Sequence, residues 1–208
     1  MEKITIISDS HIGDSNSNLL DLVYLLSTVE GTVVLAGDIY DQVLCTKKDT
    51  YDIFETIAKN KKIDKWYYIS GNNDFNIKEL FPFVVSQEEV RFCDIVVIHG
   101  HQFDSWSKEK PSWLLRLAKK ISQFTGINVR RTFLKIFPSI EKKHIMQVCN
   151  DTLAYYEGKI LIMGHTHLAM CDYPYYNCGS FTNNKSSYLQ ITIDDNGVAF
   201  FELKNIRK

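Results

Sequence analysis

The chain has 208 residues, of which 45% are hydrophobic and 24% are charged, with a formal net charge of −1. This is an ordinary globular composition, and no apolar run approaches the roughly 20 residues that a membrane-spanning helix needs. We therefore expect one domain over residues 1–208, with a helical insertion that forms a lid at about residues 102–150. The first residues, MEKITIISDSHIGD, read as a strand and lack the features of a signal peptide.

The five cysteines include no C-x-x-C pair, and their number is odd. Free thiols in a reducing compartment are the expected state, which predicts a cytoplasmic protein and argues against a zinc site built on cysteine.

In chain order, short apolar runs alternate with segments of helical periodicity. Leucines at helical spacing predict a helix over 18–29, and a second helix is expected over 49–60. The tail reads as consecutive short strands joined by turns such as Asp195-Asn196-Gly197, a strong hairpin signal. Buried strands are predicted over residues 3–7, 32–37, 65–71, 94–100 and 159–165. The alternation predicts an α/β fold whose ligand site lies beyond the carboxyl ends of the strands.

Polar and ionisable side chains follow each of the five predicted strands, and five of the six histidines are among them. Taken singly, each group reads as a solvated turn or loop start, but together they recur at every strand end. In chain order they are Asp9 and His11, then Asp38, then Asn72, Asn73 and Asp74, then His99 and His101, and finally His165 and His167.

This set of side chains is suited to two divalent cations about 3.5–4 Å apart, which need a bridging carboxylate and further nitrogen and oxygen ligands. Asp38 is the expected bridge. One cation would take Asp9, His11 and His167, and the other would take Asn72, His99 and His165. Without thiolate ligands, manganese is the first expectation, and iron, zinc and magnesium are alternatives.

The same motifs resemble the calcineurin-like metallophosphoesterase family, whose pattern is D-x-H, GD, GN(H/R)(D/E), H-G-(H/D) and G-H-x-H. The similarity runs in order from Asp9 to His167, and the later segment NCGS, residues 177–180, resembles the family's N-x-G-S. The resemblance implies an α/β/β/α fold, a two-sheet β-sandwich flanked by helices. It also implies hydrolysis of a phosphoester or phosphoanhydride by attack of a metal-bridging hydroxide.

One position departs from the family pattern, because Asn73 stands where many members have His or Arg. An amide cannot act as a general acid. Either His101 takes that role or the leaving group needs no proton, as in a phosphoanhydride. Catalytic roles are accordingly expected for His99, His101, Asn73 and Asp74, with Asn73 also contacting the substrate.

Residues 108–144 carry ten basic and two acidic side chains, a net charge of +8, whereas the remainder of the chain carries −9. Together with its aromatic residues, the segment resembles by position and character the lid of UDP-2,3-diacylglucosamine hydrolases. It therefore predicts a phosphorylated small-molecule or lipid-linked substrate, contacted by Arg130 and Arg131, and peripheral contact with a membrane. A plain helical cap with solvated lysines would have the same composition.

Two alternatives remain open from the sequence. A nuclease or cyclic-nucleotide phosphodiesterase would use the basic segment to follow a phosphate backbone, so nucleic acid is an alternative partner. A non-catalytic scaffold of the same fold is the other, although a scaffold is expected to have lost at least one ligand.

Overall fold

The computed structural model describes residues 1–42, 44–46, 52–53, 55, 59–74, 84–104, 138–183 and 185–206. The chain divides into two compact units. One unit comprises residues 1–99 with 158–208, and the other comprises residues 100–157. The expected lid at about residues 102–150 stays a prediction, because residues 105–137 lie outside the described part.

The first unit contains a seven-stranded sheet within the described residues, in the order β10-β11-β1-β2-β3-β4, with β12 beside β11. Strands β1 to β4 run parallel, and β11 pairs antiparallel with both β1 and β12. The strands are β1 (Glu2–Ile7), β2 (Gly31–Ala36), β3 (Ile63–Ile69), β4 (Val85–Gln87), β10 (Phe181–Thr182), β11 (Lys185–Ile193) and β12 (Ala199–Asn205). Since parallel strands end on the same edge, the segments after β1, β2 and β3 come together.

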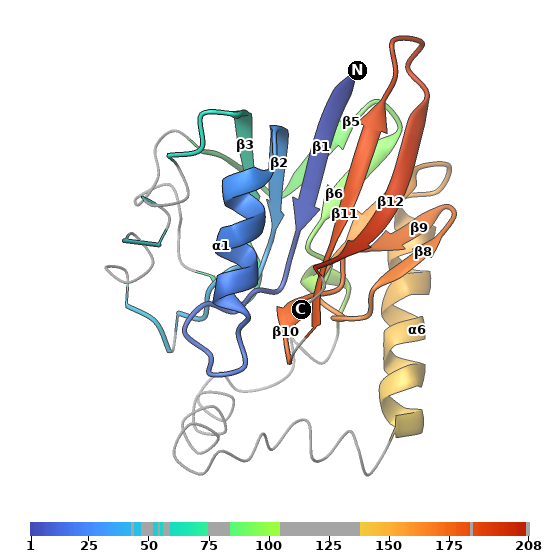
Figure 1. Ribbon diagram of the computed structural model, residues 1–208. Helices are drawn as coiled ribbons and strands as arrows, with labels where there is room; N and C mark the ends of the chain where they lie inside the picture. The colour runs from blue at the N-terminus through green and yellow to red at the C-terminus, as the bar shows by residue number, and fades with distance from the viewer. Residues whose placement is uncertain are drawn as a thin grey trace. The chain divides into compact units, whose positions relative to one another are not determined.

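A second sheet of five described strands has the order β5-β6-β7-β9-β8, in which β6, β7 and β9 are parallel. Its strands are β5 (Glu89–Phe92), β6 (Ile95–Ile98), β7 (Ile160–Met163), β8 (Met170–Asp172) and β9 (Tyr175–Asn177). The predicted two-sheet fold is confirmed, and both sheets can be followed in Figure 1.

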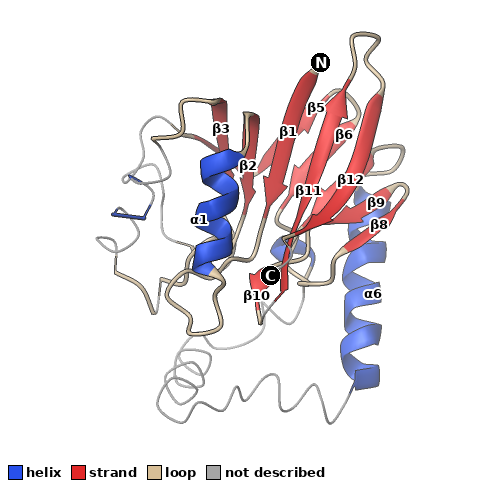
Figure 2. Cartoon of the chain, viewed as in Figure 1, coloured by secondary structure: helices blue, strands red, loops and turns tan. Residues whose placement is uncertain are grey.

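Alternation along the strands gives the seven-stranded sheet two apolar faces. Ile4 and Ile6 of β1 lie in the core between the sheets, whereas Ile7 belongs to the core on the other face. Helix α1 (Leu19–Thr28) covers that other face, as Figure 2 shows, with Leu22 and Leu26 fully buried beneath it. The sandwich therefore has one core between the sheets and a second one under α1.

The second unit contains the 3-10 helix η2 (His101–Phe103) and the long helix α6 (Pro138–Tyr155) among its described residues. Pro138 begins α6, as expected for a residue without a backbone N–H. The other helices expected in the insertion fall in residues 105–137, outside the described part. No described helix has the length and hydropathy to span a membrane.

The strands predicted over residues 3–7, 32–37, 65–71, 94–100 and 159–165 are confirmed as β1, β2, β3, β6 and β7, and the helix over 18–29 is confirmed as α1. The tail is a run of strands as predicted, and the β11–β12 hairpin turns where expected, with Gly197 at φ 82°. The sequence reading missed β4 and β5. Most of the helix expected over 49–60 lies outside the described residues.

We expect Leu26→Ala to lower the free energy of unfolding by about 2–5 kcal/mol, because Leu26 is fully buried in the core under α1 and its loss leaves a cavity. Leu20→Ala in the same helix is the matched control. Leu20 is 85% exposed, so its replacement should change stability by no more than about 0.5 kcal/mol. Urea denaturation followed by circular dichroism measures both, and equal effects would contradict this packing of α1.

Candidate metal centre

Side chains from both sheets converge at the carboxyl ends of the parallel strands. Asp9 follows β1 and Asp38 follows β2 in the seven-stranded sheet, while His99 follows β6 and both His165 and His167 follow β7 in the five-stranded sheet. Asp9, Asp38 and His99 are buried. The predicted convergence of these five residues is therefore present in one compact unit.

Several residues at this edge of the sheets have a strained backbone with positive φ. Among the described residues, seven that are not glycine have positive φ, and five of them are at the converging strand ends. Asp and His tolerate this region better than most residues, but each such position still costs of the order of 1–3 kcal/mol and tends to occur at functional sites. These five are Asp9 (53°), His11 (44°), Asp38 (51°), His165 (63°) and His167 (60°).

The first group of facing donor atoms consists of Asp9, His11 and His167. Oδ1 of Asp9 lies 3.2 Å from Nε2 of His167 and 3.8 Å from Nε2 of His11, and the two Nε2 atoms are 3.3 Å apart. All three donor atoms lie within 4.8 Å of one another. One cation could be held by this group.

The second group consists of Asp9, Asp38 and His99, whose donor atoms also lie within 4.8 Å of one another. Nδ1 of His99 donates to the carbonyl oxygen of Ala36 at 2.9 Å, which leaves Nε2 directed at Oδ1 of Asp38, 3.6 Å away. Backbone acceptors orient metal-binding histidines in this way.

Asp38 faces a histidine of each group. Its Oδ1 faces His99, and its Oδ2 lies 3.8 Å from Nε2 of His11. His165 lies beside the second group, with its ring centroid 5.1 Å from that of His99 and its backbone N–H donating to Oδ2 of Asp9 at 2.8 Å. The expected assignment of these residues to two cations stays a prediction that this geometry supports.

The ionisable groups at the centre shift one another's pKa values. Burial disfavours ionisation of Asp9, but His167 and His99 outweigh it and lower its pKa to about 2. The pKa of Asp38 is likewise held well below its usual value, because His99 and His11 offset its burial. Burial disfavours the charged form of His99, yet Asp38 and Asp9 raise its pKa to about 9. Buried carboxylates that favour the protonated form of a neighbouring histidine also provide a suitable environment for a divalent cation.

Asp74, in the segment after β3, accepts hydrogen bonds from the backbone around Asp38. Oδ2 of Asp74 accepts the backbone N–H of Asp38 at 2.8 Å and that of Gly71 at 2.7 Å, and Oδ1 accepts the N–H of Tyr40 at 3.2 Å. Burial, with the nearby charge of Asp38, raises the pKa of Asp74 to about 7. These contacts are those of a residue that positions the backbone, and the catalytic role expected for Asp74 stays a prediction.

Asn72 and Asn73 differ in their surroundings. Asn72 is exposed, whereas Asn73 is half-buried and directs its side chain at the Asp38 carboxylate. The expectations that Asn72 binds a cation and that Asn73 contacts the substrate stay predictions. The sequence reading missed the contact of Asn73 with Asp38, because no sequence pattern shows which of two adjacent amides faces inward.

Two glycines permit the close packing of the centre. A Cβ on Gly71 would lie 2.1 Å from Oδ1 of Asp38, and one on Gly164 would lie 2.6 Å from Oδ2 of Asp9. Small residues at the ends of the apolar runs are the sequence signal for this. The NCGS segment contacts the loop after β7, because Nδ2 of Asn177 donates to the carbonyl oxygen of Gly164 at 2.8 Å.

The remaining predicted residues belong to the second unit. His101 is in η2, and Arg130 and Arg131 lie outside the described residues. Within this unit, Nε2 of His144 lies 2.7 Å from Oδ1 of the buried Asp104, a pairing that the sequence reading missed. Their separation of 40 residues gave no local signal.

The sequence matches the calcineurin-like phosphoesterase superfamily domain over residues 2–196. The chain belongs to this family. Among proteins of curated function, none matches it. As the family typically binds divalent metals, these Asp and His groups are the chain's candidate metal centre.

Three solved structures are similar to this chain. A conserved uncharacterized protein from Streptococcus pneumoniae, described as a predicted phosphoesterase, is 17% identical, with 98% of each chain covered and a TM-score of 0.43. Vps29 from Chaetomium thermophilum is 16% identical, with 99% of this chain and 97% of that chain covered and a TM-score of 0.45.

A 5'-nucleotidase precursor from Thermus thermophilus is 10% identical, with 99% of this chain and 54% of that chain covered and a TM-score of 0.42. All three TM-scores are below 0.5, so no function is transferred from these proteins.

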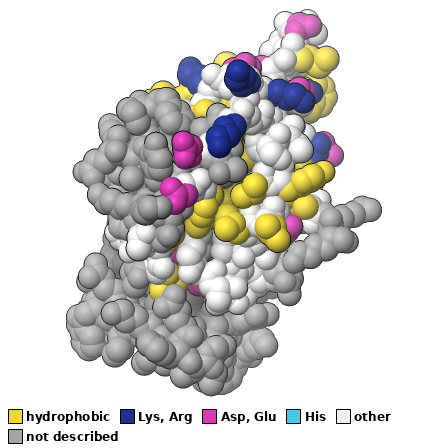
Figure 3. All heavy atoms as spheres, turned by 60° about the vertical axis from the view of Figure 1, so that its left-hand side comes forward, with side chains coloured by type: hydrophobic (Ala, Val, Ile, Leu, Met, Phe, Trp, Pro, Cys, Tyr) yellow, Lys and Arg dark blue, Asp and Glu magenta, His cyan; other side chains and the backbone are white. Residues whose placement is uncertain are grey.

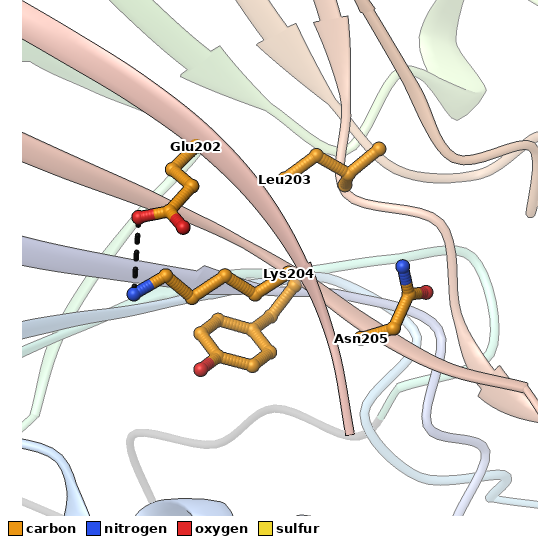
Figure 4. A pocket seen from close by; sticks show the side chains of 5 residues that line it. Glu202, Leu203, Lys204 and Asn205 are labelled. Atoms are coloured by element: carbon orange, nitrogen blue, oxygen red, sulfur yellow. Dashed lines mark ion pairs between the residues drawn. The ribbon is translucent and has the colours of Figure 1, made fainter. Parts of the chain in front are cut away.

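A separate open hollow lies on β11 and β12 (Figure 4), lined by Tyr188, Glu202, Leu203, Lys204 and Asn205. Nζ of Lys204 lies 3.1 Å from Oε2 of Glu202 and donates to Oε1 of Gln190, so its charge is already paired. Described charges of both signs are also interspersed on the face seen in Figure 3. Neither feature gives the concentrated positive field that would attract a phosphate.

We expect Gly71→Ala to weaken the binding of Mn²⁺ at least about tenfold, because the added methyl group would displace the Asp38 carboxylate. Gly197→Ala is the matched control: Gly197 has φ 82° and nothing within 4 Å of an added Cβ, so it should cost about 1–2 kcal/mol of stability and leave Mn²⁺ binding unchanged. Isothermal titration calorimetry measures the affinity. Undiminished binding by Gly71→Ala would show that Asp38 does not take part.

Proposed function

We propose that this chain is a dinuclear-metal phosphohydrolase that cleaves a phosphoester or phosphoanhydride. The observation that carries the proposal is the pair of donor groups that share Asp9 at the carboxyl ends of strands from both sheets. Asp9, His11 and His167 would hold one cation, and His99 with Asn72 and His165 would hold the other, with Asp38 between them.

Two divalent cations in such a centre supply a water nucleophile at neutral pH and neutralise charge on the phosphoryl oxygens. The chain's own residues do the rest. Asp9 and Asp38 remain anionic because nearby imidazoles lower their pKa values. The hydrogen bond from Nδ1 of His99 to Ala36 fixes the ring so that Nε2 faces the centre.

At the position where many members of the family have His or Arg, the amide of Asn73 cannot release a proton to a leaving group. We propose that the natural substrate has a leaving group that departs without one, as a phosphoanhydride does. A pyrophosphate of the UDP-2,3-diacylglucosamine type fits this chemistry and the basic character of residues 108–144. A cytoplasmic location and manganese as the cation belong to the same proposal.

We expect Asp38→Asn to lower the metal content toward one cation or none and to reduce kcat/KM for p-nitrophenyl phosphate by more than about 100-fold. The amide keeps the volume of the carboxylate but removes the charge between His11 and His99. Elemental analysis and a hydrolysis assay measure the two effects. Asp64→Asn, at an exposed position of β3, is the control. Full activity of Asp38→Asn would refute the assignment, and metal binding without hydrolysis of any substrate by the unmodified protein would favour a scaffold.

We expect an aryl phosphate to exceed an alkyl phosphate ester in kcat/KM by about 100-fold or more, since general acid catalysis is worth that much to a poor leaving group. Both substrates are assayed under one metal. Phosphodiesters, cyclic nucleotides and nucleotide-diphospho-lipids in the same panel separate the alternative substrate classes. Equal rates for the aryl and alkyl substrates would mean that another acid is present, and His101→Ala would identify it.

A further inference from the structure

Asn73 contacts both oxygens of the Asp38 carboxylate. Its backbone N–H donates to Oδ1 at 2.8 Å, and its side-chain Nδ2 donates to Oδ2 at 2.5 Å. A single residue therefore holds the carboxylate at two points, much as a bidentate arginine does, but without adding a charge.

The loop that carries Asn73 is itself fixed against the loop that carries Asp38. The carboxylate of Asp74 accepts the backbone N–H of Asp38, and the carbonyl oxygen of Asn73 accepts the N–H of Gln42 at 2.9 Å. Asp74 thus holds the backbone of Asp38 while Asn73 holds its side chain. Two adjacent residues of one loop determine where the carboxylate lies and how its plane is turned.

The orientation that results suits a bridging carboxylate. Each carboxylate oxygen has two lone-pair directions. Asn73 donates one hydrogen bond to each oxygen. The same two oxygens also face imidazoles of the two donor groups, with Nε2 of His99 3.6 Å from Oδ1 and Nε2 of His11 3.8 Å from Oδ2. Asn73 thus holds the carboxylate so that each oxygen faces one of the groups proposed to hold a cation.

We propose that Asn73 is a positioning residue for the cations, a two-point clamp on the Asp38 carboxylate, and not a residue that touches the substrate. This inference rests on the proposed function. It gives a physical role to the position at which the chain departs from the family pattern. Because the side-chain amide of Asn73 donates to Asp38, it faces a proposed cation ligand. Contacts with the substrate are then made by other residues.

The amide could have a different role if its oxygen were directed at Asp38. Two acceptor oxygens that face each other repel unless both bind the same cation, and in that case Asn73 would be a ligand itself. The experiment must therefore separate a clamp from a ligand, and both from a substrate contact.

The test is a titration with Co²⁺ in the absence of substrate, in which the visible absorption bands report the set of ligand atoms and the titration curve reports the affinity. Asn73→Ala and Asn73→Leu both remove the amide, and leucine keeps most of its volume in case the alanine variant folds poorly. Asn72→Ala removes a proposed ligand, and Asn205→Ala at an exposed position of β12 is the matched control. Unfolding midpoints with a chelator present verify that each variant is folded.

We expect the Asn73 variants to bind Co²⁺ about 10–100-fold more weakly with band positions unchanged, since the ligand atoms are the same but less well oriented. Asn72→Ala should shift the bands, and Asn205→Ala should change nothing. Unchanged affinity in the Asn73 variants would overturn the inference, as would a band shift like that of a lost ligand. Failure of the unmodified protein to bind Co²⁺ and Mn²⁺ would instead overturn the proposed function itself.

Discussion

The requirement to keep two buried carboxylates charged organises this molecule. Asp9 and Asp38 are removed from water at the ends of adjacent parallel strands, where an uncompensated charge would be very costly. Compensation comes from backbone N–H groups and from imidazoles that reach them across the sandwich. The left-handed residues, the close approach of Gly71 and the loop contacts of Asp74 all serve to place these partners.

Much of the fold and of the centre could be predicted because the signals are local. Apolar runs such as residues 32–37 and 159–165 read directly as buried strands, and polar residues after such runs must collect at one edge of a parallel sheet. The residue types then suggest the chemistry. This logic predicts that Asp9, Asp38 and His99 meet, and the structure brings their donor atoms within 4.8 Å of one another.

The features that the sequence did not indicate depend on tertiary context. Strands β4 and β5 are short and mixed in polarity, so neither has a clear period. The inward position of Asn73 and the exposure of Asn72 follow from how two loops pack, and two adjacent amides look equivalent in a sequence. The pairing of Asp104 with His144 joins residues far apart along the chain. Such contacts arise only when distant segments have already come together.

The sharing of the centre between two sheets has a consequence for how the chain folds. The contacts of His165 and His167 with the first sheet join residues 156 positions apart, and such long-range contacts are slow to form. A partly folded chain with one sheet assembled would hold only some of the donor atoms. Cations would therefore bind only after both sheets have packed together, and they would not nucleate either sheet. Their binding would stabilise the folded sandwich by mass action. Resistance to opening along this edge would then depend on the cation concentration around the protein.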